Sequence, residues 1–202
     1  MAKMQEYDRH STADMSTVIE MIRAVMHSPN FRSTAKIKGE VNGTPVKLSS
    51  LRLQTFAAHG TTCAECGQEA SFFAVERDLA QAARNGSFHI NLYGIDSEGK
   101  DVLFTHDHVV ARALGGKDRL ENTRTCCYHC NNKKAGLEGE ISQHLKLGAT
   151  FDWPDHATTT GLFISDLLEI YQQLGPVPGS GYKLEDVFPE LNQPLTFFTS
   201  LR

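Results

Sequence analysis

Two pairs of cysteines in this sequence have a spacing that is typical of metal ligands. Two residues separate the members of each pair, and the pairs are Cys63 with Cys66 and Cys127 with Cys130. Four thiolates fill the tetrahedral coordination of zinc, so together they would form a closed structural site that ties two distant segments together. Cys126 could replace Cys127, although Cys127 keeps the two-residue spacing. The alternative is two unconnected pairs of reduced, buried thiols.

Polar residues beside the second cysteine pair could bind a harder ion and move a proton. Asp107 precedes His108, and Asn131 follows Cys130. Carboxylate and amide oxygens suit Mg²⁺ or Mn²⁺, which leave coordination positions for water and phosphate oxygens. His108 is then the candidate general base for an attacking water. Each residue alone would ordinarily be a surface or turn residue, and their occurrence together beside the cysteines favours a catalytic site.

The segment that carries these residues predicts a β-hairpin, a loop and a helix. Apolar and polar residues alternate over 88–93, a second strand-like run spans 102–110, and a turn at 96–99 joins them. Asp107 and His108 would lie at the hairpin's end, where the backbone can direct both toward one pocket despite the alternation of faces. A loop is expected over 111–125, with a tight turn at Gly115 and Gly116, and a helix over 131–138.

The order of these residues resembles a known family. An Asp-His pair, a Gly-Gly loop, an asparagine and Cys-x-x-Cys-Asn-x-x-Lys follow one another, as in the HNH endonucleases, and the resemblance covers 63–136. It is most similar to the four-cysteine members of phages and bacteria. The resemblance implies a ββα-metal (His-Me finger) core with a four-cysteine zinc site. Together with the helical extensions that the residue patterns predict at both ends, this gives an α+β fold. Ala111 stands where many members have proline, and an inserted helix lengthens the span between Cys66 and Asp107.

The resemblance also implies a role for each matching residue. It makes His108 the general base, and Asp107 and Asn131 the ligands of a catalytic Mg²⁺ or Mn²⁺. It assigns Asn122 to the loop, where this residue would orient His108 through backbone contacts. The four cysteines would hold the structural zinc.

Charge indicates where nucleic acid would bind. The whole chain has a net charge of -4, yet the stretch 99–136 carries seven Lys or Arg against four Asp or Glu. Phosphate contacts need such a basic region, because most contacts to DNA are made to its backbone. The candidates are Arg112, Lys117, Arg119, Lys133 and Lys134.

The remaining sequence predicts extensions around a core, with residues 1–60 before it, 61–138 as the core and 139–202 after it. Helices are expected over 15–27 after Asp14, over 51–58, 72–83, 140–147 and 161–174, and a hairpin at Asn42 and Gly43. Residues 1–13 are expected to be irregular. The apolar C-terminal tail would cover the core or meet a protein partner or a second copy. Neither a signal peptide nor a membrane span is predicted, so we expect a cytoplasmic protein, bacterial or phage-encoded.

Two functions remain open at this point. The first is a metal-dependent DNA endonuclease, which the complete set of Asp107, His108, Asn122 and Asn131 favours. The second is a catalytically silent zinc-stabilised module that binds nucleic acid or a protein partner, which the acidic flanks and the apolar tail fit better.

Overall fold

The computed structural model describes residues 7–29, 31, 36–82, 86–158 and 161–189. It combines helices and strands, as the predicted α+β class requires. The chain divides into two compact units. One comprises Met1–Cys63, Gly67–His106 and Arg124–Cys127, and the other Ala64–Cys66, Asp107–Thr123 and Tyr128–Arg202. The three segments predicted from the sequence stay a prediction. Among the described residues, no helix is both long enough and apolar enough to cross a membrane.

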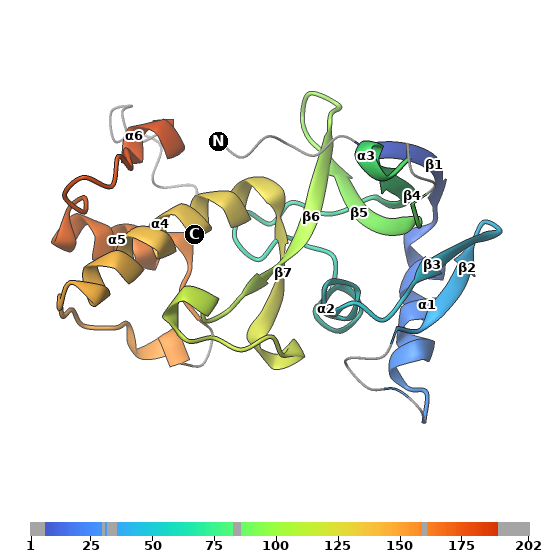
Figure 1. The fold of residues 1–202 in the computed structure, drawn as a ribbon, viewed down its shortest axis with the longest axis horizontal. Coiled ribbons are helices and arrows are strands. Elements are labelled where there is room, and N and C mark those ends of the chain that lie inside the picture. Colours follow the sequence, from blue (N-terminus) through green and yellow to red (C-terminus); the bar gives the residue numbers. More distant parts are fainter. Residues whose placement is uncertain (1–6, 30, 32–35, 83–85, 159–160, 190–202) are drawn as a thin grey trace. The chain divides into compact units, whose positions relative to one another are not determined.

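Most of the first unit is built on a five-stranded sheet with strand order β1-β4-β5-β6-β7 (Figure 1). The strands are β1 (Tyr7–Ala13), β4 (Phe72–Asp78), β5 (His89–Ile95), β6 (Asp101–His108) and β7 (Thr123–Cys127). β5 and β6 are antiparallel, with Leu92 opposite Phe104. The predicted hairpin is therefore confirmed, and β6 ends at His108, directly after Asp107.

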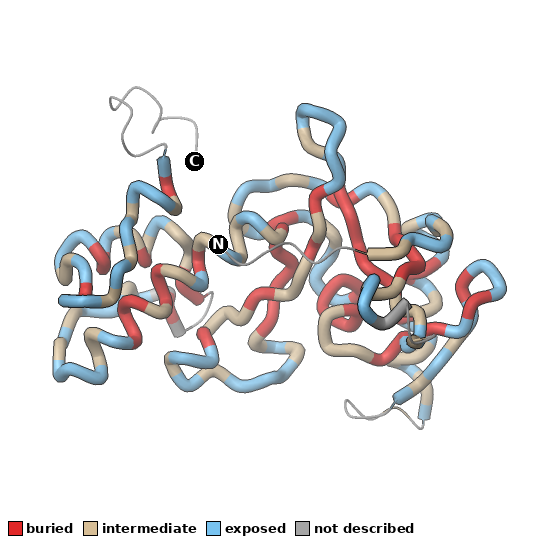
Figure 2. Tube along the Cα trace, turned by 45° about the horizontal axis from the view of Figure 1, so that its top comes forward, coloured by how far each residue is buried: buried red, intermediate tan, exposed pale blue. Residues whose placement is uncertain are grey.

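β4 shows that the helix predicted over 72–83 was wrong. Phe73, Ala74, Val75 and Glu76 are buried in succession, and β4 is an inner strand of the sheet that pairs with β1 along one edge and with β5 along the other. A strand buried on both faces loses its alternation, and a continuous apolar run does not distinguish strand from helix. Of the described residues in this range, only Leu79–Ala82 is helical, as α3. Figure 2 shows buried residues, in red, along strands of the sheet.

The remaining N-terminal elements follow their local sequence signals. They are α1 (Met15–Met26), β2 (Lys38–Val41), β3 (Thr44–Lys47) and α2 (Leu51–His59). Asp14 caps α1 and Ser50 caps α2, each by accepting a hydrogen bond from a backbone N–H. Asn42 and Gly43 both have positive φ and join β2 to β3, as predicted. Residues 7–13, expected to be irregular, instead form β1 along the edge of β4.

One carboxylate is fully buried within the first unit. Glu76 accepts hydrogen bonds from the side chains of Asn91 and Tyr93, the latter at 2.7 Å, and Arg9 lies 3.5 Å away. Burial, together with the bond to Glu76, raises the pKa of Tyr93 well above its usual value. These partners compensate the buried charge, so we assign Glu76 to the stability of the sheet.

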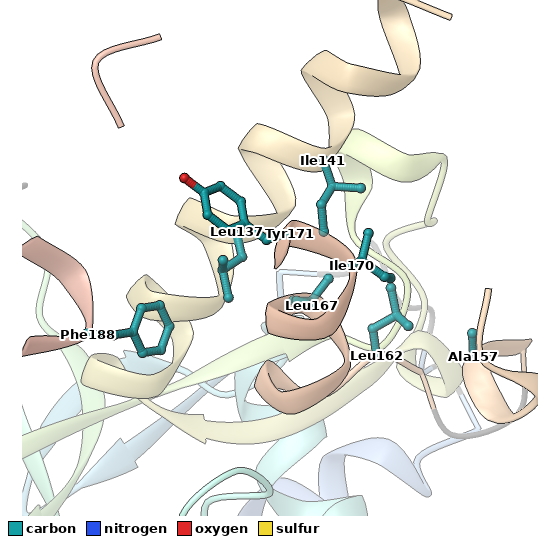
Figure 3. Packing of buried hydrophobic residues seen from close by; sticks show 8 residues of the cluster. All are labelled: Leu137, Ile141, Ala157, Leu162, Leu167, Ile170, Tyr171 and Phe188. Carbon is teal, nitrogen blue, oxygen red and sulfur yellow. The ribbon is translucent and has the colours of Figure 1, made fainter. Parts of the chain in front are cut away.

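The second unit is mainly helical. It contains η1 (Arg112–Leu114), η2 (Leu120–Asn122), α4 (Tyr128–Lys146), η3 (Asp155–Thr158), α5 (Ile164–Leu174) and α6 (Leu184–Val187). Figure 3 shows its core, in which Leu137 and Ile141 of α4 pack with Leu167 and Ile170 of α5. Phe188 joins this core, and the tail from 190 onward lies outside the described residues.

Two boundaries differ from the predictions near the candidate site. Residues 123–125 were expected to end the loop predicted over 111–125, but they begin β7 (Thr123–Cys127). α4 begins at Tyr128, directly after β7, and continues through the two helices predicted over 131–138 and 140–147. Cys127 is therefore the last residue of a strand, and Cys130 lies in the first turn of a helix.

Candidate active site and cysteine cluster

The structure brings four of the five cysteines together. The sulfur atoms of Cys63, Cys66, Cys127 and Cys130 all lie within 4.8 Å of one another. In a tetrahedral site with Zn–S bonds of about 2.3 Å, the sulfurs are separated by about 3.8 Å, so the cluster is compact enough for one ion. The two cysteine pairs are thus positioned to hold a metal ion, as the spacing predicts.

Cys126 is outside this cluster but close to it. Its side chain is fully buried, and its sulfur lies 3.8 Å from that of Cys63. At this distance a thiol can donate a weak hydrogen bond to a neighbouring thiolate. We therefore assign Cys126 to packing beside the cluster, and Cys127 to the cluster itself.

Asp107 lies in a buried charged network with Lys134 and Glu138. The Lys134 ammonium donates to both carboxylate oxygens of Asp107, at 3.0 and 2.8 Å, and forms an ion pair with Glu138 at 2.8 Å. It also donates to the backbone carbonyl of His108 at 2.8 Å. One ammonium therefore fixes both the Asp107 side chain and the backbone of the adjacent His108.

Lys134 was predicted to contact phosphate, and its position contradicts that prediction. Its side chain is fully buried, with 0% exposure, and its ammonium already binds two carboxylates and a carbonyl. The other four residues predicted to contact phosphate are more exposed to solvent. Arg112, Lys117 and Arg119 are exposed, while Lys133 is half-buried, with its ammonium 5.0 Å from the centre of the Phe188 ring.

We expect Lys134→Met to lower the free energy of unfolding by about 3–5 kcal/mol, the usual cost of removing one partner from a buried ion pair. The substitution leaves Asp107 and Glu138 buried without their shared ammonium. Urea unfolding of the zinc-loaded protein measures this loss. Lys133→Met is the matched control, since the half-buried ammonium of Lys133 lies over the face of Phe188, and it should cost about 1 kcal/mol or less. If both variants lost the same free energy of unfolding, the ion pairs of Lys134 would contribute no particular stability.

His108 lies at the end of β6, and its ring is hydrogen-bonded. Its Nε2 atom is 2.7 Å from Oδ1 of Asp118. The side chain of His108 is 14% exposed, whereas that of Asp118 is 62% exposed. The imidazole is thus partly sheltered, and it contacts an acid at the surface of the loop that follows.

Asn122 holds this loop closed through its side chain. Its Oδ1 accepts from the N–H of Val110 at 2.9 Å, and its Nδ2 donates to the carbonyls of Val110 and Lys117, both at 3.0 Å. Its backbone carbonyl also accepts from the N–H of Val109. The asparagine therefore anchors the two residues that follow His108.

The two glycines of the loop are required for different reasons. Gly115 has φ +94, in the left-handed region that glycine adopts without strain. A Cβ on Gly116 would lie 1.7 Å from the carbonyl oxygen of Val110 and 2.9 Å from Nδ2 of Asn122. Gly116 thus gives Asn122 room to reach the backbone. Ala111 has φ -55, a value that proline also adopts, so the alanine leaves the backbone path unchanged.

Asn131 is half-buried in the first turn of α4. Residues three apart share a helix face, so Asn131 lies on the same face as Lys134, whose ammonium reaches Asp107. Sequence reasoning missed Glu138 and Asp118. The i, i+4 spacing of Lys134 and Glu138 is a signal for a helical ion pair, but the sequence has no feature that separates Asp118 from other loop acids.

Comparison with known proteins finds one family, and its match includes this part of the chain. Residues 96–146 match the model of the HNH endonuclease family. This segment extends from the turn before β6 to the end of α4, so it includes Asp107, His108, Asn122 and Asn131. This segment of the chain therefore resembles an HNH endonuclease domain, and the recognition made from the sequence is confirmed. Neither the curated proteins nor the solved structures contain a significant match.

Proposed function

We propose that this protein is a metal-dependent DNA endonuclease that hydrolyses phosphodiester bonds. The observation that supports this most strongly is the position of His108. It ends β6 inside the segment that matches the HNH endonucleases, and Asn122 anchors the backbone directly after it. A partly sheltered imidazole on an ordered backbone suits a general base, which must meet its water in a fixed geometry.

Asp107 and Asn131 are the proposed ligands of a divalent cation. Both offer oxygen atoms, the donors that Mg²⁺ and Mn²⁺ prefer. The Asp107 oxygens each accept one hydrogen bond from Lys134, and a carboxylate oxygen can accept more than one. Asp107, Lys134 and Glu138 together carry a net charge of -1, which suits a cation nearby. When bound, such an ion stabilises charge on the phosphate and the leaving oxygen.

Two further roles are proposed, one for exposed basic residues and one for the cysteine cluster. Arg112, Lys117 and Arg119 are exposed and are proposed to contact DNA phosphates, with Lys133 beside them. The four-cysteine cluster would hold zinc, whose preference for four thiolates matches the donor set. A zinc ion held by four thiolates would have no open coordination position, so its role would be structural.

A catalytically silent nucleic-acid-binding module is the second candidate, and one observation favours it. The Lys134 ammonium contacts both oxygens of Asp107, so it could stand permanently in place of a metal ion. In that case the protein would bind DNA through the same exposed basic side chains but would never cut it.

Nicking of supercoiled plasmid separates these candidates. The endonuclease should relax or linearise the plasmid with Mg²⁺ or Mn²⁺ and stop when EDTA is added, with zinc content checked so that loss of the structural ion is not mistaken for loss of the catalytic one. The silent module should bind the plasmid equally well and leave it intact with every divalent ion.

We expect Asn131→Ala to raise the Mg²⁺ concentration needed for half-maximal cleavage by about 10-fold or more, because even outer contacts of a metal site contribute about 10- to 100-fold. Asp107→Asn, which keeps the size of the side chain, should act in the same direction. Zinc content should stay unchanged in both variants. A variant that cuts normally at low Mg²⁺ would show that its residue is not a ligand.

A further inference from the structure

The contact between His108 and Asp118 is built into the loop. Asp118 follows Lys117, whose carbonyl accepts from Nδ2 of Asn122 at 3.0 Å. The same Nδ2 donates to the carbonyl of Val110, two residues after His108. One asparagine therefore fixes the backbone close to both members of the pair, whose side chains meet at 2.7 Å.

The chemistry of this contact determines where the imidazole carries its hydrogen. An ionised carboxylate can only accept hydrogen bonds, so the Nε2 atom of His108 must be the donor. In a neutral imidazole the other nitrogen, Nδ1, then has the lone pair that can accept a proton. A carboxylate that holds a histidine in one tautomer is an established way to prepare a general base.

We propose that Asp118 is a positioning residue that holds His108 in the tautomer with hydrogen on Nε2 and thereby makes Nδ1 the base. This inference rests on the proposed endonuclease function. In the step, Nδ1 takes a proton from water while the water oxygen forms a bond to phosphorus. The bond from phosphorus to the leaving ester oxygen breaks, and that oxygen takes a proton from solvent.

The expected effect is moderate because Asp118 is largely exposed. Its side chain is 62% exposed, so solvent screens its charge, and the orientation of the ring is the main contribution. We expect Asp118→Ala to lower the single-turnover cleavage rate about 10-fold, by analogy with the lower end of the range for carboxylates that orient metal-ligating histidines. Asp118→Glu should recover part of the rate, because its carboxylate can still accept from Nε2.

The control is Glu121→Ala, which removes an exposed acid from the same loop. Both alanine variants remove one negative charge from a basic region, so both should bind DNA as well as the wild type or slightly better. Only Asp118→Ala should cut more slowly once DNA is bound. The Asp118→Ala variant should need no more Mg²⁺ than the wild type. The double variant with His108→Ala and Asp118→Ala should cut no more slowly than His108→Ala alone.

A measurement of the tautomer keeps this inference separate from the proposed function. The ¹⁵N chemical shifts of His108 in the full chain should show hydrogen on Nε2 in the wild type and a mixture in Asp118→Ala. Wild-type protein that never cuts DNA would overturn the endonuclease function, while the shifts would still report whether Asp118 controls the ring. The inference is overturned if Asp118→Ala changes neither the tautomer of His108 nor the cleavage rate. It is also overturned if Asp118→Ala slows cleavage by the His108→Ala variant as much as it slows cleavage by the wild type, or if it changes the Mg²⁺ concentration needed for cleavage.

Discussion

His108→Ala is expected to cut DNA about 10²- to 10⁴-fold more slowly than the wild type, the usual contribution of a general base. The substitution removes the imidazole but leaves the backbone carbonyl that accepts from Lys134 and the loop anchored by Asn122. The expected loss therefore lies in the chemical step. Single-turnover cleavage with protein in excess over a labelled duplex measures it, because neither DNA binding nor product release then limits the rate.

The same variant should keep its other properties. Zinc content, melting temperature and DNA affinity should match the wild type, because the imidazole is assigned neither to the cysteine cluster nor to the phosphate contacts. His27→Ala is the matched control: this exposed histidine is the C-cap residue directly after α1 in the first unit, and it should be dispensable for cleavage. If His108→Ala cuts as fast as the wild type, another group is the base.

Cys127→Ser is expected to abolish metal binding at the cysteine cluster, and the purified wild type to contain about one zinc per chain. Structural zinc sites bind with about 10–16 kcal/mol in small peptides, and this free energy is coupled to folding. If about 5 kcal/mol of it stabilises this chain, the melting temperature should fall by about 10–20 °C. Elemental analysis and thermal unfolding measure the two effects.

Cys126→Ser is the control for this experiment. Cys126 is equally buried and adjacent in the chain, but its sulfur contacts that of Cys63 from outside the cluster. The variant should keep its zinc and lose little stability. Equal loss of metal from both variants would mean that the two cysteines exchange roles.

Sequence reasoning succeeded where a residue type has one dominant physical use. The paired cysteines, the Asn42-Gly43 turn and the end of the hairpin at His108 belong to this group, since thiolate chemistry, left-handed backbone and strand alternation each leave few alternatives. The domain type followed from the order of such residues, and the family match confirms it.

The failures have a common cause, which is that burial depends on partners distant in the chain. The sequence of β4 was interpreted as a helix because four successive residues are buried, and neither the strands that pair with β4 nor the parts of the chain that cover its faces are visible in the segment itself. Lys134 was grouped with the surface cations because lysine is rarely buried, and only the proximity of Asp107 and Glu138 makes its burial possible. The contact between Asp118 and His108 likewise depends on how the loop closes.

The adjacent glycines of the loop have a consequence for how far this sequence could diverge. Gly115 is constrained by backbone handedness, and no atom lies within 4 Å of the position of its missing Cβ, so asparagine or aspartate could replace it at modest cost. Gly116 is constrained by volume, because any side chain would overlap the Val110 carbonyl at 1.7 Å. If the closed loop is needed for function, related sequences should therefore have glycine, asparagine or aspartate at the position of Gly115, but only glycine at the position of Gly116.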